Sequence, residues 1–275
     1  MQAEPLPTLQ LAPLEHCVLH ESIDPQRVAR LVATLAGEAY LRNPPVVARY
    51  AGSERFMVLD GATRTTALRQ LGLQAAPVQI VNYADARIEL HTWAHVLHNV
   101  NLHSLQRALR MIEGVRLRRI DAREAEHLVH EPGVLGSLLT PEGEAWALEG
   151  GGSLVEEARL LELVFRCYSG RATVHRLPHD ARLTAASLPE GTIAAFYPRY
   201  TKLDLLKLTH AGGIVPAGIT RHVIPGRVLR LNVPLAQLRT GSFEAQQAWF
   251  AAWVAERIAV GRARLYTEPT WLFDE

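Results

Sequence analysis

Cysteine is scarce in this chain, since Cys17 and Cys167 are the only two among 275 residues. Two thiols without metal-ligand spacing argue against a cysteine metal site and favour a reducing, cytoplasmic setting. No apolar run approaches the length that a bilayer requires, and no basic stretch followed by an apolar core opens the sequence. We therefore expect neither a membrane span nor a secretion signal. The net charge of only +1 gives no reason to expect nonspecific nucleic-acid binding.

Lysine is almost missing as well, because Lys202 and Lys207 are the only lysines and the other cationic side chains are arginines. A GC-rich genome would explain this bias. A lysine kept under the bias indicates a position that needs a compact, flexible ammonium group. Two leftover surface lysines are the alternative. Lys202 lies at an expected helix start, and Lys207 lies further along the same helix.

The remaining composition is that of a soluble globular protein, with 48% hydrophobic and 21% charged residues. The length suits one large domain or two smaller ones. Short strands and helices alternate over residues 14–85, and a mostly helical stretch follows over 88–190. The rest returns to mixed structure, with a helix at 201–211, a strand near 228–233 and an amphipathic helix at 243–259.

Residues 59–73 carry the most informative local pattern. A strand ends at Asp60-Gly61, and apolar residues at helical spacing follow. Such a junction directs free backbone N–H groups and the positive end of a helix toward whatever lies in front of it. Thr63 and Arg64 add a hydroxyl and a fixed cation in the first turn. The pattern predicts a cradle for phosphate oxygens, and a capped turn without a ligand is the alternative.

Several histidines invite a metal-site hypothesis, which their spacing does not support. His95, His98 and His103 fall in an expected helical region, but gaps of three and five residues do not place all three on one face. No carboxylate joins them at ligand spacing. Residues 113–126 mix glutamates with many arginines, and we interpret them as a solvated helix face.

Six segments together resemble a known family. The first three are His20-Glu21-Ser22-Ile23-Asp24-Pro25, Arg42-Asn43-Pro44-Pro45-Val46-Val47 and Leu59-Asp60-Gly61-Ala62-Thr63-Arg64. They resemble the ParB/sulfiredoxin-like superfamily. The other three are His91-Thr92-Trp93-Ala94-His95, Tyr197-Pro198-Arg199-Tyr200-Thr201-Lys202 and Thr220-Arg221-His222-Val223-Ile224-Pro225-Gly226-Arg227. They are similar to the free L-serine kinases (the SerK/SbnI group), so the resemblance spans most of residues 14–240.

The resemblance implies an α+β fold with two domains. Residues 1–87 would form a ParB/sulfiredoxin-like nucleotide-binding domain. Residues 88–275 would form a helix-rich α+β substrate-side domain, with the active site in the cleft between the two. The implied reaction is phosphorylation of free L-serine to O-phospho-L-serine, with ATP or ADP as donor and Mg²⁺ as cofactor. The product would serve cysteine or siderophore-type synthesis.

The resemblance also assigns roles to individual residues. Glu21 would be the catalytic base, and Asp60 would hold Mg²⁺ or orient the hydroxyl. The nucleotide and its phosphates would be bound by Asn43, Val46, Gly61, Ala62, Thr63, Arg64 and Thr65. Serine would be bound by Trp93, Thr201, Lys202, Thr220, Arg221 and His222. Each assignment has a structural alternative. Glu21 would be a carboxylate that precedes a helix start, Trp93 would be an aromatic residue of the core, and residues 220–222 would form an edge strand.

One departure from the family keeps other functions open. The family usually has Asp-Gly-His-His-Arg, whereas this chain has Ala62 and Thr63 in place of the two histidines. A nucleotide-binding homologue with weakened catalysis is therefore one alternative. Ala62 also replaces the reactive cysteine of sulfiredoxins, so sulfiredoxin chemistry is not expected.

A ParB-like DNA-binding regulator is the second alternative, although we expect no nucleic-acid partner. It would use the arginines between residues 107 and 123. The sequence does not specify the oligomeric state.

Overall fold

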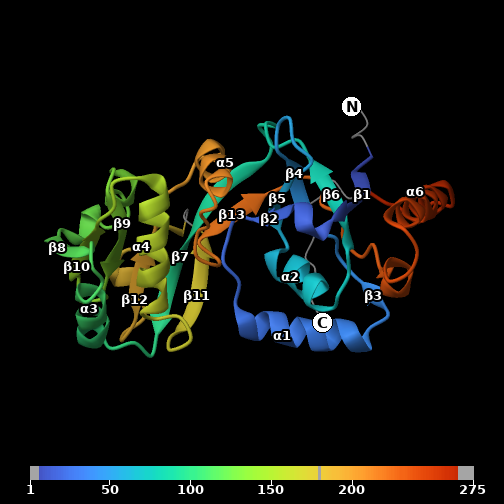
Figure 1. The fold of residues 1–275 in the computed structure, drawn as a ribbon. Helices are drawn as coiled ribbons and strands as arrows, with labels where there is room; N and C mark the ends of the chain where they lie inside the picture. The colour runs from blue at the N-terminus through green and yellow to red at the C-terminus, as the bar shows by residue number, and fades with distance from the viewer. Residues whose placement is uncertain (1–5, 179–180, 266–275) are drawn as a thin grey trace. The chain divides into compact units, whose positions relative to one another are not determined.

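The computed structural model describes residues 6–178 and 181–265, and the chain divides into two compact units (Figure 1). The first unit comprises Met1–Cys17, Gln26–Asn82 and Ile224–Glu275. The second comprises Val18–Pro25 and Tyr83–Val223. The predicted domains at 1–87 and 88–275 stay a prediction. The compact units follow a different division, because distant segments return to pack with the early strands.

A mixed sheet with strand order β1-β6-β4-β5-β2 forms the centre of the first unit. Its strands are β1 (Thr8–Pro13), β2 (Cys17–Leu19), β4 (Val46–Arg49), β5 (Phe56–Asp60) and β6 (Ala75–Val81). Strand β4 runs parallel to β6, whereas β4 with β5 and β1 with β6 are antiparallel pairs. Four of the five β5 residues are buried, as expected for a short apolar run at the centre of a sheet.

The helices of the first unit are α1 (Pro25–Gly37), α2 (Ala62–Gln70) and α6 (Phe243–Ala259), and β3 (Tyr40–Leu41) pairs with β14 (Val233–Pro234). Helix α6 contacts the edge strand β1, where the Gln247 side chain accepts a hydrogen bond of 2.9 Å from the Leu11 backbone N–H. The bond from α6 therefore satisfies a donor at the sheet edge.

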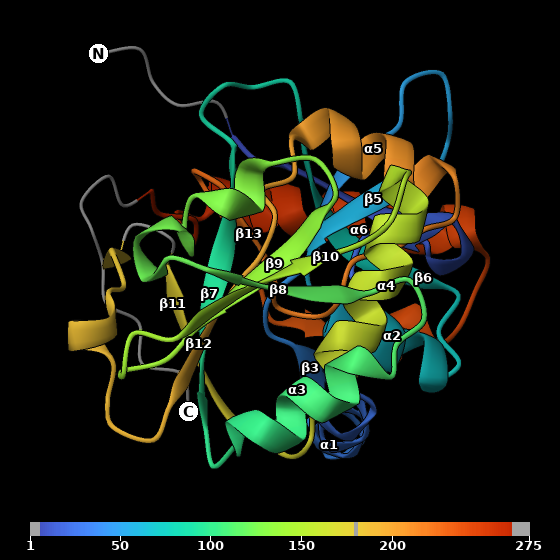
Figure 2. The ribbon, with the colours of Figure 1, turned by 90° about the vertical axis from the view of Figure 1, so that its left-hand side faces the viewer.

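A larger sheet forms the second unit, with order β11-β7-β12-β9-β10-β8 and with β13 also paired to β7. Its strands are β7 (Glu89–His98), β8 (Arg116–Ile120), β9 (Val134–Leu139), β10 (Ala145–Glu149), β11 (Thr173–Pro178), β12 (Ile193–Phe196) and β13 (Thr220–Val223). Its helices are α3 (Leu102–Arg110), α4 (Leu154–Arg166) and α5 (Lys202–His210). Helix α4 contacts β9 of this sheet (Figure 2).

Short 3₁₀ turns connect several of these elements, at Leu14–His16, Ala122–Glu124, Leu128–His130, Ala185–Ser187 and Leu235–Leu238. Among the described residues, no helix combines the length and hydropathy needed to cross a bilayer.

The predicted helices at 201–211 and 243–259 agree with the structure. The mostly helical character of 88–190 is wrong, because β7, β8, β9, β10 and β11 lie in this stretch. Leucine, alanine, glutamate and arginine favour helices locally, but pairing with distant strands overrides that preference. The predicted strand near 228–233 shrinks to β14.

The same error affected two smaller predictions. Residues 113–126 form β8 and a 3₁₀ turn rather than one helix face. His95 and His98 lie on β7, and His103 lies on α3. Residues 140–143 form a turn that joins β9 to β10, in which the Gly143 N–H donates to the Thr140 carbonyl over 3.0 Å.

Truncation of Phe250 should destabilise the first unit. Phe250 lies in α6 and is fully buried, whereas Phe243 at the start of the same helix is 37% exposed. A buried Phe→Ala change costs about 3–5 kcal/mol through lost burial and the cavity that remains. We expect Phe250→Ala to lower the free energy of unfolding in urea by that amount and the control Phe243→Ala to cost much less. Equal losses would contradict the packing of α6.

Candidate active site

The strand-to-helix junction between β5 and α2 requires a glycine. Gly61 has φ +98° and ψ 28°, in the left-handed region, and caps the start of α2. A Cβ at this position would lie 3.1 Å from the Pro45 Cα and 3.1 Å from the Arg64 guanidinium. Both the backbone angle and the close approach therefore exclude larger residues. The junction places Asp60 and Arg64 side by side.

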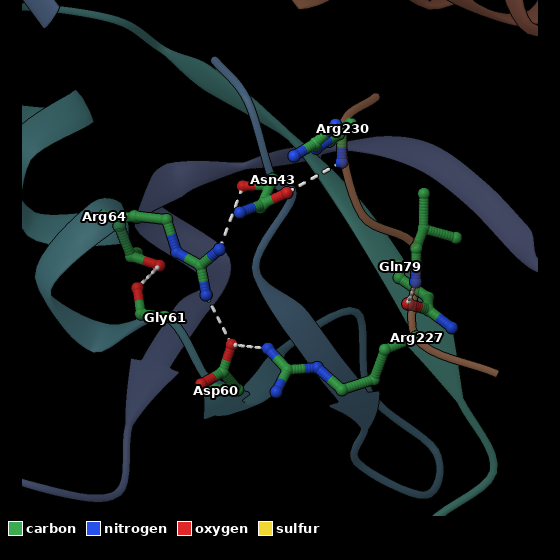
Figure 3. A network of polar contacts seen from close by, with 9 residues as sticks. Asn43, Asp60, Gly61, Arg64, Gln79, Arg227 and Arg230 are labelled. Carbon is green, nitrogen blue, oxygen red and sulfur yellow. Dashed lines mark hydrogen bonds and ion pairs between the residues drawn. The ribbon is translucent and has the colours of Figure 1, made fainter. Parts of the chain in front are cut away.

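The Asp60 carboxylate lies between two guanidinium groups (Figure 3). One oxygen accepts hydrogen bonds from Arg64 and, over 2.6 Å, from Arg227. Arg64 also donates to the Asn43 carbonyl over 3.1 Å. We call Asn43, Asp60, Arg64 and Arg227 the Asp60 cluster. Two guanidinium charges against one carboxylate leave a surplus positive charge beside the start of α2, an arrangement that suits an anion.

A segment far along the chain supplies Arg227, and two amide side chains hold that segment. Gln79 is only 4% exposed; its amide donates to the Gly226 carbonyl over 2.9 Å and accepts from the Val228 N–H over 2.8 Å. The Asn43 side chain accepts from the Arg230 N–H over 2.8 Å. The sequence did not indicate Arg227 or Gln79 as site residues. The one available signal was the position of Arg227 at the end of the 220–227 segment.

The predicted phosphate-binding residues separate into two groups. Asn43, Gly61 and Arg64 join the Asp60 cluster or border it. The others are Val46, Ala62 and Thr65, which are buried, and Thr63, which is half-buried in the first turn of α2. The Thr65 hydroxyl donates to the Gly61 carbonyl over 3.0 Å and stabilises the turn.

Glu21 lies in the second unit, where residues 20–22 run beside residues 215–218. Backbone hydrogen bonds of 2.8 and 2.9 Å join Ser22 and His20 to Val215. One oxygen of the Glu21 carboxylate accepts from the Gly218 N–H over 3.1 Å. The Ser22 hydroxyl accepts from the Ala217 N–H over 3.0 Å. These contacts fix the carboxylate on a rigid backbone rather than on a loose loop.

Strand β13 places Thr220, Arg221 and His222, which were predicted to bind serine together, on two different faces. Successive side chains of a strand point to opposite faces. Thr220 lies 2.9 Å from the His20 ring nitrogen, and His222 lies 2.8 Å from the Tyr83 hydroxyl. The His20 and His222 rings are 5.1 Å apart, so these residues share one face. We call His20, Glu21, Thr220 and His222 the Glu21 cluster.

Arg221 points to the opposite face of β13, where its guanidinium carbon lies 4.7 Å from the centre of the Trp93 ring. This stacking holds one face of the planar guanidinium and leaves its edge oriented for a carboxylate. The structure thus pairs Trp93 with Arg221, as the predicted substrate pocket required, but separates both from Thr220 and His222.

The start of α5 contributes one cation. The Thr201 hydroxyl caps α5 and exchanges hydrogen bonds with Asp204, so it serves the helix terminus. The Lys202 ammonium donates to the Asp85 carbonyl over 2.8 Å and lies 5.4 Å from the centre of the Tyr83 ring. Burial raises the pKa of the Tyr83 hydroxyl above its usual value, so Tyr83 stays protonated between Lys202 and His222.

The chain is 28% identical over 270 residues, 97% of both chains, to the ATP-dependent L-serine kinase SbnI of Staphylococcus aureus. It is 24% identical over 225 residues to the ADP-dependent L-serine kinase SerK of Thermococcus kodakarensis, covering 80% of this chain and 88% of SerK. The chain is a homologue of the free L-serine kinases. No family model matches it.

Solved structures of these kinases share the fold. A C-terminally truncated SbnI from Staphylococcus aureus has a TM-score of 0.72 and 24% identity, covering 91% of this chain and 97% of that one. A free serine kinase in complex with AMP has a TM-score of 0.71 and 22% identity, covering 84% and 93%. The predicted resemblance and the α+β fold class are therefore confirmed.

The DNA-binding alternative is not favoured for this serine-kinase homologue. The arginines that it required are spread over α3, β8 and the turn at 122–124, so they do not form one basic recognition helix. Three of them form ion pairs with the β9–β10 hairpin: Arg118 with Glu149 at 2.6 Å, Arg119 with Glu144 at 3.6 Å and Arg116 with Glu149 at 4.0 Å.

Replacement of Gln79 should release the segment that carries Arg227. Gln79→Leu removes both amide contacts and leaves the Val228 N–H and the Gly226 carbonyl without them, at a cost of about 1–3 kcal/mol. We expect hydrogen exchange of the 226–230 backbone to accelerate roughly 5- to 150-fold, a range that corresponds to this free energy. Gln70→Leu, at the exposed end of α2, is the matched control. Unchanged exchange in Gln79→Leu would show that another contact holds the segment.

Proposed function

We propose that this chain is a kinase that transfers the terminal phosphoryl group of ATP or ADP to the hydroxyl of free L-serine, giving O-phospho-L-serine. The observation that carries the proposal is the surplus positive charge of the Asp60 cluster at the start of α2. It occurs in a chain that aligns over 97% of its length with an ATP-dependent L-serine kinase. Named relatives include both ATP- and ADP-dependent kinases, so both donors enter the tests.

The Asp60 cluster would bind the phosphates. Phosphate oxygens bind the same guanidinium edges as a carboxylate oxygen does. A nucleotide phosphate would therefore replace the Asp60 carboxylate as the hydrogen-bond acceptor of Arg64 and Arg227. Backbone N–H groups at the start of α2 would add donors. In the absence of nucleotide, Asp60 keeps both cations oriented toward the position that a phosphate would take. Stabilising the charge on the transferred group is the main task of a phosphoryl-transfer site.

Glu21 would act as the base. One of its oxygens accepts the Gly218 N–H, and the other would take the proton of the serine hydroxyl as that oxygen attacks phosphorus. The new serine O–P bond forms while the bond between the terminal phosphorus and its bridging oxygen breaks. The shortened nucleotide leaves as ADP or AMP.

Arg221 would bind the serine carboxylate, with Trp93 stacked against the guanidinium and covering the pocket. Thr220 and His222 lie on the other face of β13, so their proposed part is to support Glu21 through His20. Lys202 would add positive charge beside Tyr83 and His222. The predicted cleft between the domains stays a prediction.

The residues present do not form a resident Mg²⁺ site. Among the described residues, no group of three or more histidine, cysteine, aspartate or glutamate side chains is placed to hold a metal ion. Asp60, the predicted ligand, accepts from two guanidinium groups instead. We therefore assign no step to a metal held by the protein. Mg²⁺ would enter coordinated by the phosphates of the nucleotide.

The cytoplasm is the compartment that we propose, because the described chain keeps both cysteines as free thiols. Burial raises the pKa of the Cys17 thiol to about 11, so Cys17 is not a reactive thiolate.

The activity is tested by incubating the purified protein with L-serine, Mg²⁺ and either ATP or ADP. Formation of O-phosphoserine together with ADP or AMP would support the proposal. Nucleotide binding without product would instead support the non-catalytic alternative.

Glu21→Gln should remove most of the turnover without weakening nucleotide binding. Glutamine keeps an acceptor for the Gly218 N–H but cannot accept a proton, and loss of a general base costs about 10²–10⁴-fold in kcat. Glu15→Gln is the control, because the Glu15 side chain is 83% exposed. Steady-state kinetics and nucleotide titration measure the two effects. A Glu21→Gln enzyme with wild-type turnover would disprove the base assignment.

Arg221→Lys and Arg227→Lys form a matched pair, one for each substrate. Lysine keeps the charge but loses the two-point contact. Loss of a charge-assisted hydrogen bond is worth about 1.5–3 kcal/mol, or roughly one to two decades of affinity. We expect Arg221→Lys to raise the KM for serine and Arg227→Lys to raise the KM for nucleotide, each by that factor. The reverse pattern would exchange the two assignments.

A further inference from the structure

His95 is a buried histidine to which the proposed chemistry gives no role. It lies on β7 and has 0% exposure, next to Arg176 on β11 and Ala195 on β12 in the register of the sheet. Burial lowers the pKa of His95 from 6.5 to about 4, with Arg176 acting in the same direction, so the ring is neutral near pH 7. A neutral imidazole carries one N–H, and its two neighbours decide which nitrogen holds it.

The hydrogen-bond partners of His95 determine that tautomer. The Nε2 atom lies 2.9 Å from the Gly218 carbonyl oxygen, which can only accept, so Nε2 carries the hydrogen. The Nδ1 atom must then accept, and the Tyr168 hydroxyl lies 3.0 Å away as its donor. The Tyr168 hydroxyl contacts the Tyr197 hydroxyl, which also lies 3.4 Å from Nδ1 as a second donor within reach. Tyr197, Tyr168, His95 and Gly218 thus form one row, in which the hydrogen of His95 stays on Nε2.

Gly218 connects this row to Glu21. Its carbonyl accepts from His95, and its N–H donates to the Glu21 carboxylate over 3.1 Å. The φ of Gly218 is +73°, which residues with a side chain rarely adopt, and a Cβ there would lie 2.4 Å from the Arg176 guanidinium. Fixing the carbonyl orients the residue whose N–H holds the proposed base.

We propose that His95 is a positioning residue, which holds Gly218 and through it the carboxylate of Glu21. The proposal rests on the function proposed above for Glu21. Tyr168 supports it by keeping the hydrogen of His95 on Nε2. If that hydrogen moved to Nδ1, a nitrogen lone pair would face the Gly218 carbonyl, and the two would repel.

Kinetic measurements on four variants test the proposal. His95→Leu removes the donor to Gly218, Tyr168→Phe removes the nearer of the two hydroxyls beside Nδ1, and His95→Gln keeps an N–H near the Nε2 position. His98→Leu is the matched control, because His98 lies on the same strand and stacks on His175 with ring centres 4.5 Å apart. We expect kcat to fall roughly 10- to 100-fold in His95→Leu and Tyr168→Phe, with both KM values little changed, and His95→Gln to recover most of the loss.

A spectroscopic measurement separates this proposal from the proposed kinase activity. The NMR signal of the Gly218 amide should shift when Glu21→Gln is introduced into the wild type, because that amide donates to the carboxylate. The same change in the His95→Leu background should shift it much less. This result would support the positioning role even if the wild type made no phosphoserine.

Two outcomes would overturn the positioning role. The first is a wild-type kcat in both His95→Leu and Tyr168→Phe. The second is an equal Glu21-dependent shift of the Gly218 amide in the wild-type and His95→Leu backgrounds. If His95→Leu fails to fold, a wild-type kcat in the double variant Tyr168→Phe/Tyr197→Phe would overturn the role instead, because that variant keeps both rings and removes both hydroxyls near Nδ1.

Discussion

The pairing of Asp60 with two arginines is the interaction on which the first unit's site depends. It joins the end of β5, the first turn of α2 and a segment more than 160 residues further along the chain. The negative charge of the carboxylate offsets the repulsion between the two guanidinium groups, so both can bind the same carboxylate oxygen. Gln79 and Asn43 hold the backbone that carries Arg227 and Arg230. A surplus of positive charge is thereby held at a helix start by amide side-chain contacts.

In the second unit, backbone hydrogen bonds hold the Glu21 carboxylate in place. Residues 20–22 pair with the backbone near Val215, and Gly218 reaches Glu21 through its N–H. The alternation of β13 then distributes the nearby polar side chains over two faces, with Arg221 and Trp93 on one and Thr220 and His222 on the other.

Local patterns predicted the features that local chemistry controls. The Asp60-Gly61 junction follows from an apolar run that ends at a residue able to adopt positive φ. The start of α5 at Thr201 follows from a capping box. The helical reading of residues 88–190 failed because strands such as β9 and β10 gain their stability from partners elsewhere in the sheet. Helix-forming residues inside a strand give no local sign of this.

By itself, the sequence determined the α+β class, the strand-to-helix turn at Asp60-Gly61 and the kinship with free L-serine kinases. These depend on residues close together in the chain or on motifs that can be compared directly. Only the tertiary structure decided that Arg227 shares Asp60 with Arg64, that Arg221 parts from Thr220 and His222, and that buried His95 reaches Gly218. Each of these contacts joins residues distant in the chain or depends on which face of a strand a side chain occupies, and strand pairing sets both.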